Sequence, residues 1–414
     1  MIRSKPSKYK ILIIIGLLAI ISCGNYLPKQ HNFPEPVDTR SVIIQEQTKT
    51  SYEIDGVYAS NEFDGARLND FEKINDSTYR ATITPENEPI NESAYYCFEI
   101  WSDADRAIDL QLYYPGHEHR YVPKIRLEGN EAWKRMDTTL FDTLISPDLA
   151  TLKIELSARH QHVCGQELSN SADNKVWSET LSSDHQNVQL EVIGQSKKGR
   201  DILCLDINEP KTKSSPAIVI MSRLHPPEVS GYMAMQAFVA ELLRDAPLSS
   251  AFRKKHRILI YPMVNPDGVD MGHWRHNAGG IDLNRDWSHY RQQENKVVAE
   301  HCVRTIKKNK NKVLIGLDFH STQEDILYTL SDNRKSTVYG FKDIWVQSLK
   351  DAIPGHDPDD APYDLNTPIS KGWFYLELDA EGITYEVGDE TDREFLKSKA
   401  EIAAREMMKL LVFR

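Results

Sequence analysis

The sequence predicts a chain of two folded domains, in which an α/β domain with a mixed sheet flanked by helices follows an all-β sandwich. Between residues 41 and 165 the apolar runs are short and alternating, and clusters of Asn, Asp, Gly and Pro separate them. This pattern is typical of a β-sandwich. In residues 170–414, strand-like runs alternate with helical patterns, which indicates an α/β domain. A length of 414 residues allows two or three domains of ordinary size.

Residues 1–22 have the layout of a signal peptide. Basic residues precede an apolar run at 11–21 (ILIIIGLLAII), which is too short for a comfortable membrane span. The next stretch, Ile-Ile-Ser-Cys, resembles a bacterial lipobox, and the resemblance implies cleavage before Cys23 and lipidation of that cysteine. An uncleaved signal anchor is the alternative. In either case we expect an exported protein tethered to the bacterial cell envelope, on its periplasmic or surface face.

Residues 23–40 are polar and contain prolines, so we interpret them as a tether between the lipid and the first domain. The formal net charge of the chain is −11 at pH 7, and no basic patch is evident in the sequence. An acidic chain of this kind is not expected to bind nucleic acid.

The sandwich region shows no catalytic constellation in its sequence. Two HxH pairs, in GHEH and RHQH, lack a nearby third ligand, and we interpret them as loop or surface histidines. Export permits disulfides, but the wide spacing of the cysteines leaves their pairing open. The cysteine in the alternating run DILCLDI is interpreted as a core thiol. The residues concerned are His117, His119, His160, His162, Cys97, Cys164, Cys204 and Cys302.

The α/β region begins with two strand-like runs, VQLEVIG and ILCLDI, that flank a polar hairpin turn at residues 195–200. Helical apolar spacing covers residues 229–243 and, in a closing amphipathic helix, 393–411. The strand-like run RILIYPMV ends in a predicted turn at residues 265–268, of sequence Asn-Pro-Asp-Gly.

Four polar residues lie at or near the ends of predicted strands in this region. The run AIVIM leads to His225 and Glu228, KVLIGLDF ends at His320, and GITYEV contains Glu386. The ligands of such sheets gather at the C-terminal ends of strands, so one cleft could hold His225, His320 and Glu386. Histidine and glutamate are both zinc ligands, although an isolated HxxE pattern is a weak signal.

Four segments together resemble the M14 zinc metallocarboxypeptidases: HPPE, NPDGVDMGHWRHNAGGIDLNRDW, LDFHS and TYEVGDE, in this order. The resemblance is to the branch that includes cytosolic carboxypeptidases and their bacterial relatives, which place a β-sandwich before the catalytic domain. It extends from about Tyr95 to the C-terminus, and the string at 265–287 is its most specific part. It implies a carboxypeptidase-like catalytic domain.

The resemblance also implies roles for single residues. His225, Glu228 and His320 match the ligands of one zinc ion, a set that leaves a fourth position open as a catalytic site requires. Glu386 matches the general base, which takes a proton from water and delivers it to the leaving amine. Arg275 matches the arginine that stabilises the tetrahedral oxyanion.

Further matched residues concern the substrate and the support of the ligands. Asn284 and Arg285 match the pair that holds the substrate's terminal carboxylate, for which a guanidinium fork is well suited. Asp282 matches an acid that orients a zinc-binding histidine. Asp318 could act similarly, but it could equally be an ordinary aspartate at a strand end.

Two residues are matched less closely. Tyr363 corresponds to a mobile tyrosine that covers the substrate, although the local spacing departs from the familiar pattern. Lys371, two places before Trp373, corresponds to a residue on the floor of the pocket for the C-terminal side chain. A cation there would favour acidic side chains. The alternative is that Lys371 points to solvent.

The resulting interpretation is a lipid-anchored zinc metallocarboxypeptidase that hydrolyses C-terminal peptide bonds of a peptide substrate. One alternative keeps the fold but makes the substrate a peptidoglycan peptide, as an amidase or carboxypeptidase. The other is a lipoprotein that binds peptides without catalysis. The sequence contains no GxSxG or P-loop string, so a serine hydrolase has no support.

Overall fold

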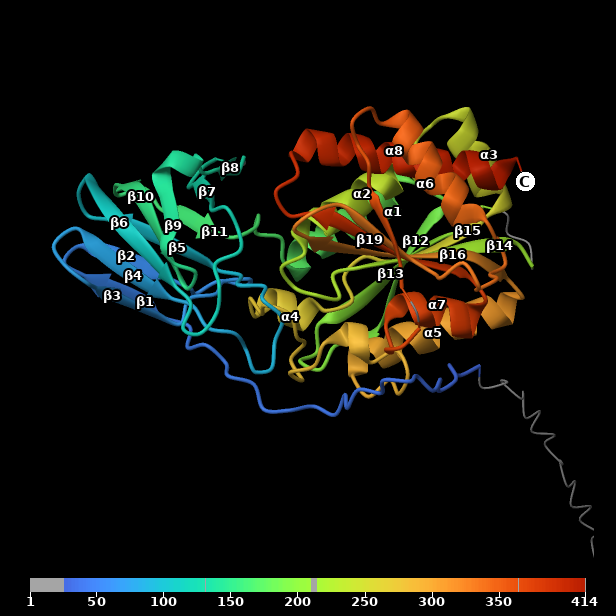
Figure 1. Cartoon of the computed structure of the whole chain (residues 1–414), viewed down its shortest axis with the longest axis horizontal. Coiled ribbons are helices and arrows are strands. Elements are labelled where there is room, and N and C mark those ends of the chain that lie inside the picture. Colours follow the sequence, from blue (N-terminus) through green and yellow to red (C-terminus); the bar gives the residue numbers. More distant parts are fainter. Residues whose placement is uncertain (1–25, 131, 210–213, 364, 414) are drawn as a thin grey trace, which may run out of the picture.

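The computed structural model describes residues 26–130, 132–209, 214–363 and 365–413. The predicted signal peptide at 1–22 and the predicted lipidation site Cys23 lie outside these residues. Among the described helices, none has the length and apolar character that crossing a membrane requires. Two regions of different architecture lie side by side: an N-terminal β-rich domain and a larger α/β domain (Figure 1).

Two packed sheets form the N-terminal domain, as the sequence predicted. Inward-facing apolar residues of both sheets alternate with outward-facing residues and form one shared core. All strand pairs are antiparallel except β4 with β6. The first sheet contains, in spatial order, β1 (Ser51–Ile54), β2 (Val57–Ser60), β5 (Cys97–Ser102), β11 (Gln161–Cys164), β7 (Lys124–Leu127) and β8 (Lys134–Arg135). The second contains β3 (Asp70–Lys73), β4 (Thr78–Thr82), β6 (Arg106–Tyr113), β10 (Leu149–Leu156) and β9 (Phe141–Ser146), with a 3-10 turn at Thr138–Leu140.

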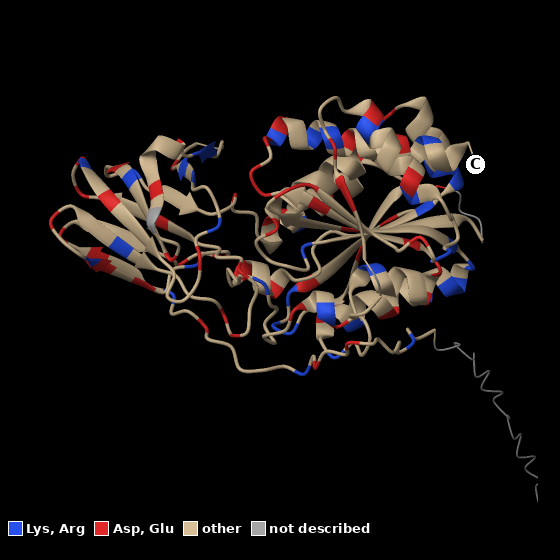
Figure 2. Ribbon diagram, viewed as in Figure 1, with Lys and Arg blue, Asp and Glu red and all other residues tan. Residues whose placement is uncertain are grey.

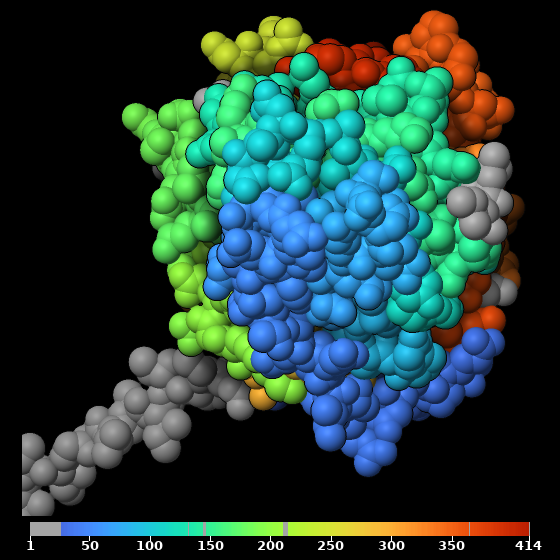
Figure 3. All heavy atoms as spheres, turned by 90° about the vertical axis from the view of Figure 1, so that its left-hand side faces the viewer, coloured from blue at the N-terminus to red at the C-terminus, as the bar shows by residue number. Residues whose placement is uncertain are grey.

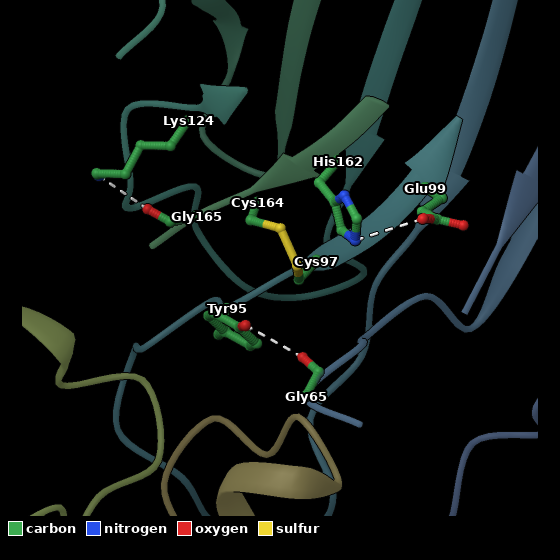
Figure 4. Close-up of a disulfide and its surroundings, with 8 residues drawn as sticks. All are labelled: Gly65, Tyr95, Cys97, Glu99, Lys124, His162, Cys164 and Gly165. Atoms are coloured by element: carbon green, nitrogen blue, oxygen red, sulfur yellow. Dashed lines mark hydrogen bonds and ion pairs between the residues drawn. A yellow bond between two sulfur atoms is a disulfide. The ribbon is translucent and has the colours of Figure 1, made fainter. Parts of the chain in front are cut away.

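The structure contains one disulfide among the described residues, in the sandwich, whereas the sequence left the pairing of the cysteines open. Cys97 and Cys164 lie directly opposite each other on β5 and β11 and are bonded (Figure 4). Cys204 and Cys302 are free and buried in the α/β domain, so Cys204 is the core thiol that was predicted. A disulfide of this kind is usual in proteins that fold outside the reducing cytosol.

A mixed eight-stranded sheet forms the centre of the α/β domain. Its inner strands β15, β14, β16 and β19 run parallel, and the flanking pairs β12–β13, β13–β15 and β17–β19 are antiparallel. The spatial order is β12 (Val188–Gln195), β13 (Asp201–Ile207), β15 (Arg257–Tyr261), β14 (Pro216–Ser222), β16 (Lys312–Thr322), β19 (Glu381–Gly388), β17 (Ile326–Thr329) and β18 (Asp359–Pro362). The buried parallel strands are almost wholly apolar, because helices cover both of their faces.

Helices α2, α6 and α8 pack on one face of this sheet and α5 and α7 on the other, each with its own apolar core (Figure 1). The helices are α1 (Ser171–Asp184), α2 (Val229–Leu243), α3 (Pro247–Lys255), α4 (Pro266–Asp270), α5 (Gln293–Asn309), α6 (Phe341–Ala352), α7 (Ser370–Leu378) and α8 (Arg393–Val412), with a 3-10 turn at Leu283–Arg285. The predicted helices at 229–243 and 393–411 are confirmed.

The predicted turn at 265–268 is wrong in detail, because these residues begin the short helix α4. The Asn265 side chain accepts a hydrogen bond from Gly268 N, and Pro266 occupies the first helical position. Both features favour a helix start as well as a turn, so the sequence could not distinguish the two.

The segment before the sandwich runs extended along the α/β domain. Residues 26–40, which belong to the stretch that we interpreted as a tether, are thus held against that domain (Figure 1). Seen from the sandwich end, blue N-terminal residues lie at the lower edge of the molecule (Figure 3). The hydrogen bonds that hold the segment include Tyr290 Oη to Lys29 O (2.9 Å), Ser288 Oγ to His31 O (2.5 Å) and Gln292 Nε2 to Thr39 O (2.6 Å). Just beyond the segment, Val42 N donates to Gly279 O at 2.8 Å.

Figure 2 shows lysines and arginines interspersed with acidic residues over both domains.

Candidate active site

Three potential metal ligands converge at the C-terminal edge of the parallel strands. His225 lies in the loop after β14, Glu228 immediately precedes α2, and His320 lies near the end of β16. One ligand atom from each lies within 4.8 Å of the other two. His320 Nδ1 is 3.2 Å from His225 Nδ1 and 2.7 Å from Glu228 Oε2, and His225 Nδ1 is 2.8 Å from Glu228 Oε1. All three residues are buried.

Local packing explains why these residues meet. Strands β14 and β16 are parallel neighbours, so the loop that follows β14 lies beside the end of β16. Helix α2 then begins directly against the backbone of His320. A Cβ atom on Gly231 would lie 2.3 Å from His320 O, so only glycine permits this approach. Gly231 N also donates to Ser321 Oγ at 2.8 Å, which fixes the start of the helix.

The outer ring nitrogens of both histidines bind carboxylates. His225 Nε2 lies 2.9 Å from Asp282 Oδ1, and His320 Nε2 lies 2.7 Å from Asp318 Oδ2. When Nε2 carries the proton, it donates a hydrogen bond to the carboxylate and the lone pair of Nδ1 is free. Neutral histidine binds a metal through such a lone pair. Two Nδ1 atoms and one carboxylate that face a common point therefore fit a divalent cation such as zinc. Asp318, whose role the sequence left open, is placed to support His320.

The electrostatics of the site also favour a cation. Burial alone would lower the pKa of His320, but the carboxylates of Asp318 and Glu228 raise it well above its usual value. Burial would raise the pKa of Glu228, yet the two histidines hold it below its usual value. The site thus favours positive charge, which a metal ion held by His225, Glu228 and His320 would supply in place of protons.

Glu386 lies beside His320, because the two residues are paired in register on the parallel strands β16 and β19. Its side chain is among those that line the cavity. In the described part of the chain, Glu386 Oε2 is buried and accepts no hydrogen bond. Burial raises the pKa of this carboxyl to about 7. A buried carboxylate oxygen with no protein partner is suited to bind and deprotonate a water molecule.

Asp282 connects a metal ligand with the residues matched to substrate binding. Its Oδ1 accepts from Asn284 N at 2.7 Å as well as from His225, and its Oδ2 accepts from Arg275 Nε at 2.8 Å. Arg285 Nη1 lies 3.7 Å from the same Oδ2 and donates to Asn284 O at 2.8 Å. The side chain of Asp282 is largely buried, with 12% exposure, and the positive charge of Arg275 holds its pKa well below the usual value although burial opposes this.

A cavity of about 460 Å³ opens over these residues. Part of its wall belongs to the sandwich, which sequence analysis did not foresee. The cavity is lined by His225, Glu228, Arg275, Asn284, Arg285, His320, Glu386, Tyr363, Ser321, Thr322, Gln323, Tyr328, Thr367, Ile369 and Thr384 of the α/β domain and by Asn91, Glu92, Ser93 and Arg120 of the sandwich.

Arg120 of the sandwich binds Asp389, the residue that follows the strand of Glu386. Its guanidinium forms an ion pair with Asp389, with Nε 2.9 Å and Nη2 2.8 Å from Oδ2. Its Nη1 donates to Glu92 O and to Ser93 Oγ, both at 3.0 Å. All of its terminal nitrogens thus bind protein, so Arg120 fixes the wall of the cavity. No sequence spacing signals this contact, because 269 residues separate the two partners.

Of the two residues matched less closely, Tyr363 lines the cavity and Lys371 does not. Tyr363 is 43% exposed, and its ring centroid lies 5.1 Å from Lys371 Nζ. Lys371 is fully buried, and its Nζ donates to Thr329 O at 2.6 Å and Tyr363 O at 2.8 Å. It does not point to solvent, which corrects that alternative, and it is not among the residues that line the cavity. Its ammonium instead holds the loop of Tyr363.

The HxH pairs do not form a second metal site. Within the described ranges, His225, Glu228 and His320 are the only group of three potential ligands that could hold an ion. His117 pairs with the exposed carboxylates of Glu88 and Glu92 at 2.8 and 3.1 Å. His160 stacks on Trp101 and, like His162, lies 3.5 Å from a carboxylate oxygen of Glu99.

Comparison with known protein families identifies the chain. The sequence model of the zinc carboxypeptidase family matches residues 174–407, which are more than half of the chain. The chain therefore belongs to the M14 zinc carboxypeptidase family, and the family implies a zinc ion at the His-Glu-His group.

Individual relatives agree with this assignment. Cytosolic carboxypeptidase 2 of Danio rerio is 36% identical over 104 residues, covering 24% of this chain and 14% of that protein. Cytosolic carboxypeptidase 2 of Homo sapiens is 30% identical over 159 residues, covering 36% of this chain and 17% of that protein. The matched region thus spans less than a fifth of the length of these relatives.

Solved structures extend the likeness to both domains. The metallo-carboxypeptidase from Burkholderia cenocepacia has a TM-score of 0.68 at 15% identity and covers 86% of this chain and 99% of its own. The metallo-carboxypeptidase from Pseudomonas aeruginosa, solved with (2-guanidinoethylmercapto)succinic acid, has a TM-score of 0.67 at 16% identity and covers 86% and 100%. At these identities the likeness establishes the fold, a carboxypeptidase-like α/β domain preceded by an antiparallel β-rich domain.

Proposed function

We propose that this protein is a zinc-dependent carboxypeptidase that releases C-terminal residues from peptides, with Glu386 as the general base. The observation that carries the proposal is the position of Glu386: its partnerless oxygen lies in the same cavity as the His225–Glu228–His320 group, on the strand next to His320. A hydrolase needs a base within reach of the attacking water, and this arrangement provides one.

Zinc at this group would supply Lewis-acid chemistry, polarising the scissile carbonyl and making a water molecule more acidic. In our proposal Glu386 accepts the proton of the attacking water. It then delivers that proton to the nitrogen of the leaving amino acid, which completes cleavage of the peptide bond. Arg275 lines the cavity with its Nε fixed on Asp282, so its terminal nitrogens are the ones available to the oxyanion.

Asn284 and Arg285 would hold the terminal carboxylate of the substrate. Both line the cavity, and the Asn284 amide is fixed because its Oδ1 accepts from Ser370 N at 2.8 Å. The side chain of Arg285 is 32% exposed and can reach an incoming carboxylate bidentately. Tyr363, at the rim, would close over the bound residue. This arrangement favours removal of a residue with a free carboxylate over cleavage within a chain.

A preference for acidic C-terminal residues remains a proposal, and Lys371 is poorly placed to determine it. The ammonium of Lys371 is engaged by backbone carbonyls of residues 329 and 363. Arg275, Arg285 and Arg120 line the cavity together with the carboxylates of Glu92, Glu228 and Glu386. We expect any acidic preference to arise from this wall. Substitution of Lys371 would then act indirectly, through the loop of Tyr363.

Anchoring by a lipid on Cys23, in the cell envelope of a bacterium, is the second part of the proposal. Support comes from the lipobox-like sequence and from the Cys97–Cys164 disulfide. Peptidoglycan peptides are then a substrate class to test beside ordinary peptides. Mass analysis of the mature N-terminus, with and without the cysteine at 23, would detect the lipid.

The experiment that tests the function is a digest of a mixed peptide library, including peptides that end in D-residues, read by mass spectrometry with and without a zinc chelator. We expect loss of single C-terminal residues that stops when the chelator is added. Loss only from D-residue peptides would favour the peptidoglycan alternative, and binding without any release would favour a non-catalytic lipoprotein.

A further inference from the structure

Glu86 is a glutamate of the sandwich whose side chain is fully buried against the α/β domain. It lies in the loop after β4, and its carboxylate accepts hydrogen bonds from three consecutive backbone N–H groups. Trp274 N lies 2.8 Å from Oε2, and Arg275 N and His276 N lie 3.0 and 2.6 Å from Oε1. Bonds to an ionised acceptor are roughly twice as strong as neutral ones, so this is a firm attachment.

The surroundings keep Glu86 charged. Burial would raise its pKa, but His273, Arg67 and His276 are near enough to hold the pKa below the usual value. Arg67 is itself fully buried, and its Nε donates to Thr84 O at 2.8 Å. Burial of an ionised carboxylate on folding costs free energy unless hydrogen bonds and opposite charges compensate for it. A role other than packing would explain why a glutamate occupies this position.

The three residues that Glu86 binds connect the sandwich core with the active-site cavity. The indole of Trp274 is fully buried in the core of the sandwich, 5.0 Å from the ring of His117. The next side chain, Arg275, lines the cavity, and its Nε donates to Asp282. The path of this backbone therefore determines where the guanidinium of Arg275 lies, and Glu86 is bonded to every peptide N–H of the segment.

Docking of the two domains does not by itself require Glu86. Other contacts join them, including Arg120 with Asp389 and Lys124 with Glu390 at 3.1 Å. At Gly272 the backbones approach so closely that a Cβ atom would lie 2.3 Å from a carbonyl oxygen of the sandwich. What Glu86 adds is the orientation of residues 274–276.

We propose that Glu86 is a positioning residue for peptide hydrolysis: through its three backbone hydrogen bonds it holds residues 274–276 so that the Arg275 guanidinium remains at the oxyanion. The sandwich then contributes to catalysis, because its Glu86 determines the position of Arg275. This inference rests on the proposed function, in which Arg275 stabilises the oxyanion.

Glu86→Gln tests the proposal because the amide has nearly the same shape but turns an N–H₂ group toward backbone donors. We expect kcat to fall on the order of 10²-fold, the usual cost of misplacing a catalytic group by about 1 Å. Because the terminal carboxylate is held elsewhere, KM should change by less than about threefold. Zinc content should be unchanged. Glu72→Gln, at an exposed carboxylate of the same domain, is the matched control and should retain full activity.

A double-mutant cycle separates positioning from a merely structural role. Arg275→Ala should lower kcat by about 10²–10³-fold, as loss of an oxyanion donor does. If Glu86 acts through Arg275, adding Glu86→Gln to Arg275→Ala should lower kcat little further. Losses that multiply in the double variant, or a wild-type kcat for Glu86→Gln alone, would overturn the proposal.

If Glu86→Gln does not fold, the same cycle is run with Glu86→Asp, which keeps the charge but withdraws it from the three N–H groups. The same decrease in kcat and the same non-additivity are expected. Failure of the proposed function looks different, since the wild-type protein itself would then release no C-terminal residue.

Discussion

Asp282→Asn is the substitution for which the structure makes the most detailed prediction. Each oxygen of this carboxylate serves a different partner: Oδ1 accepts from His225 Nε2 at 2.9 Å, and Oδ2 accepts from Arg275 Nε at 2.8 Å. An asparagine keeps one acceptor and turns an N–H₂ group toward the other donor. It can therefore support the histidine or the arginine, but not both.

The size of the effect follows from these two bonds. Loss of a charge-assisted hydrogen bond costs about 1.5–3 kcal/mol, so kcat/KM at saturating zinc should fall roughly 10–200-fold. The loss should be mostly in kcat, because Arg275 is proposed to stabilise the transition state. If the amide turns the other way, the support of His225 is lost and the dissociation constant for zinc should rise about 10–100-fold.

Two measurements on one variant separate these effects: kcat/KM for a peptide at saturating zinc, and the zinc dissociation constant from competition with a chelator. Asp206→Asn is the matched control, because Asp206 forms a similar ion pair with Arg257 away from the cavity, at 2.9 Å to Nε. A variant at position 282 that equals the wild type in both measurements would refute the role given to this carboxylate.

Three further predictions concern the same cavity. His320→Ala should lose the zinc ion, about one per chain in the wild type, and metal analysis showing full zinc in the variant would contradict the ligand assignment. Glu386→Gln should keep zinc and fold but lose about 10²–10⁴-fold in kcat. Burial raises the pKa of Glu386 to about 7, and a bound cation would lower it. The profile of kcat/KM against pH should therefore have an acidic limb at or below about pH 7, because protonated Glu386 cannot act as a base. That limb should be absent from the pH profile of the residual activity of Glu386→Gln.

Much of the fold could be predicted from the sequence, because its signals are local. Alternating runs bounded by turn residues indicated the strands of the sandwich, and a continuous apolar run such as AIVIM indicated a buried strand. The rule that ligands gather at the C-terminal ends of strands predicted that His225, His320 and Glu386 could share one cleft. The resemblance to the M14 family implied that His225, Glu228 and His320 are the metal ligands. The structure brings one ligand atom of each of these three within 4.8 Å of the other two.

What the sequence did not reveal depends on contacts between distant segments. Glu86 binds Trp274, which is 188 positions further along the chain, and Arg120 binds Asp389, which is 269 positions further along. No spacing rule relates such distant pairs. Lys371 was expected on the pocket floor by alignment of a motif, but the loop of Tyr363 folds so that its carbonyls capture the ammonium. The Cys97–Cys164 pair likewise follows only from the register of β5 and β11.

The measurement that tests the central claim most directly compares one peptide with a free C-terminal carboxylate against the same peptide with a C-terminal amide. The purified full-length chain with zinc, and the same chain treated with chelator, are assayed for release of the last residue. The account predicts zinc-dependent release from the free acid and, because Asn284 and Arg285 are proposed to bind the carboxylate, at least about tenfold slower release from the amide. Equal release from both peptides, or release that survives complete removal of the metal, would contradict it.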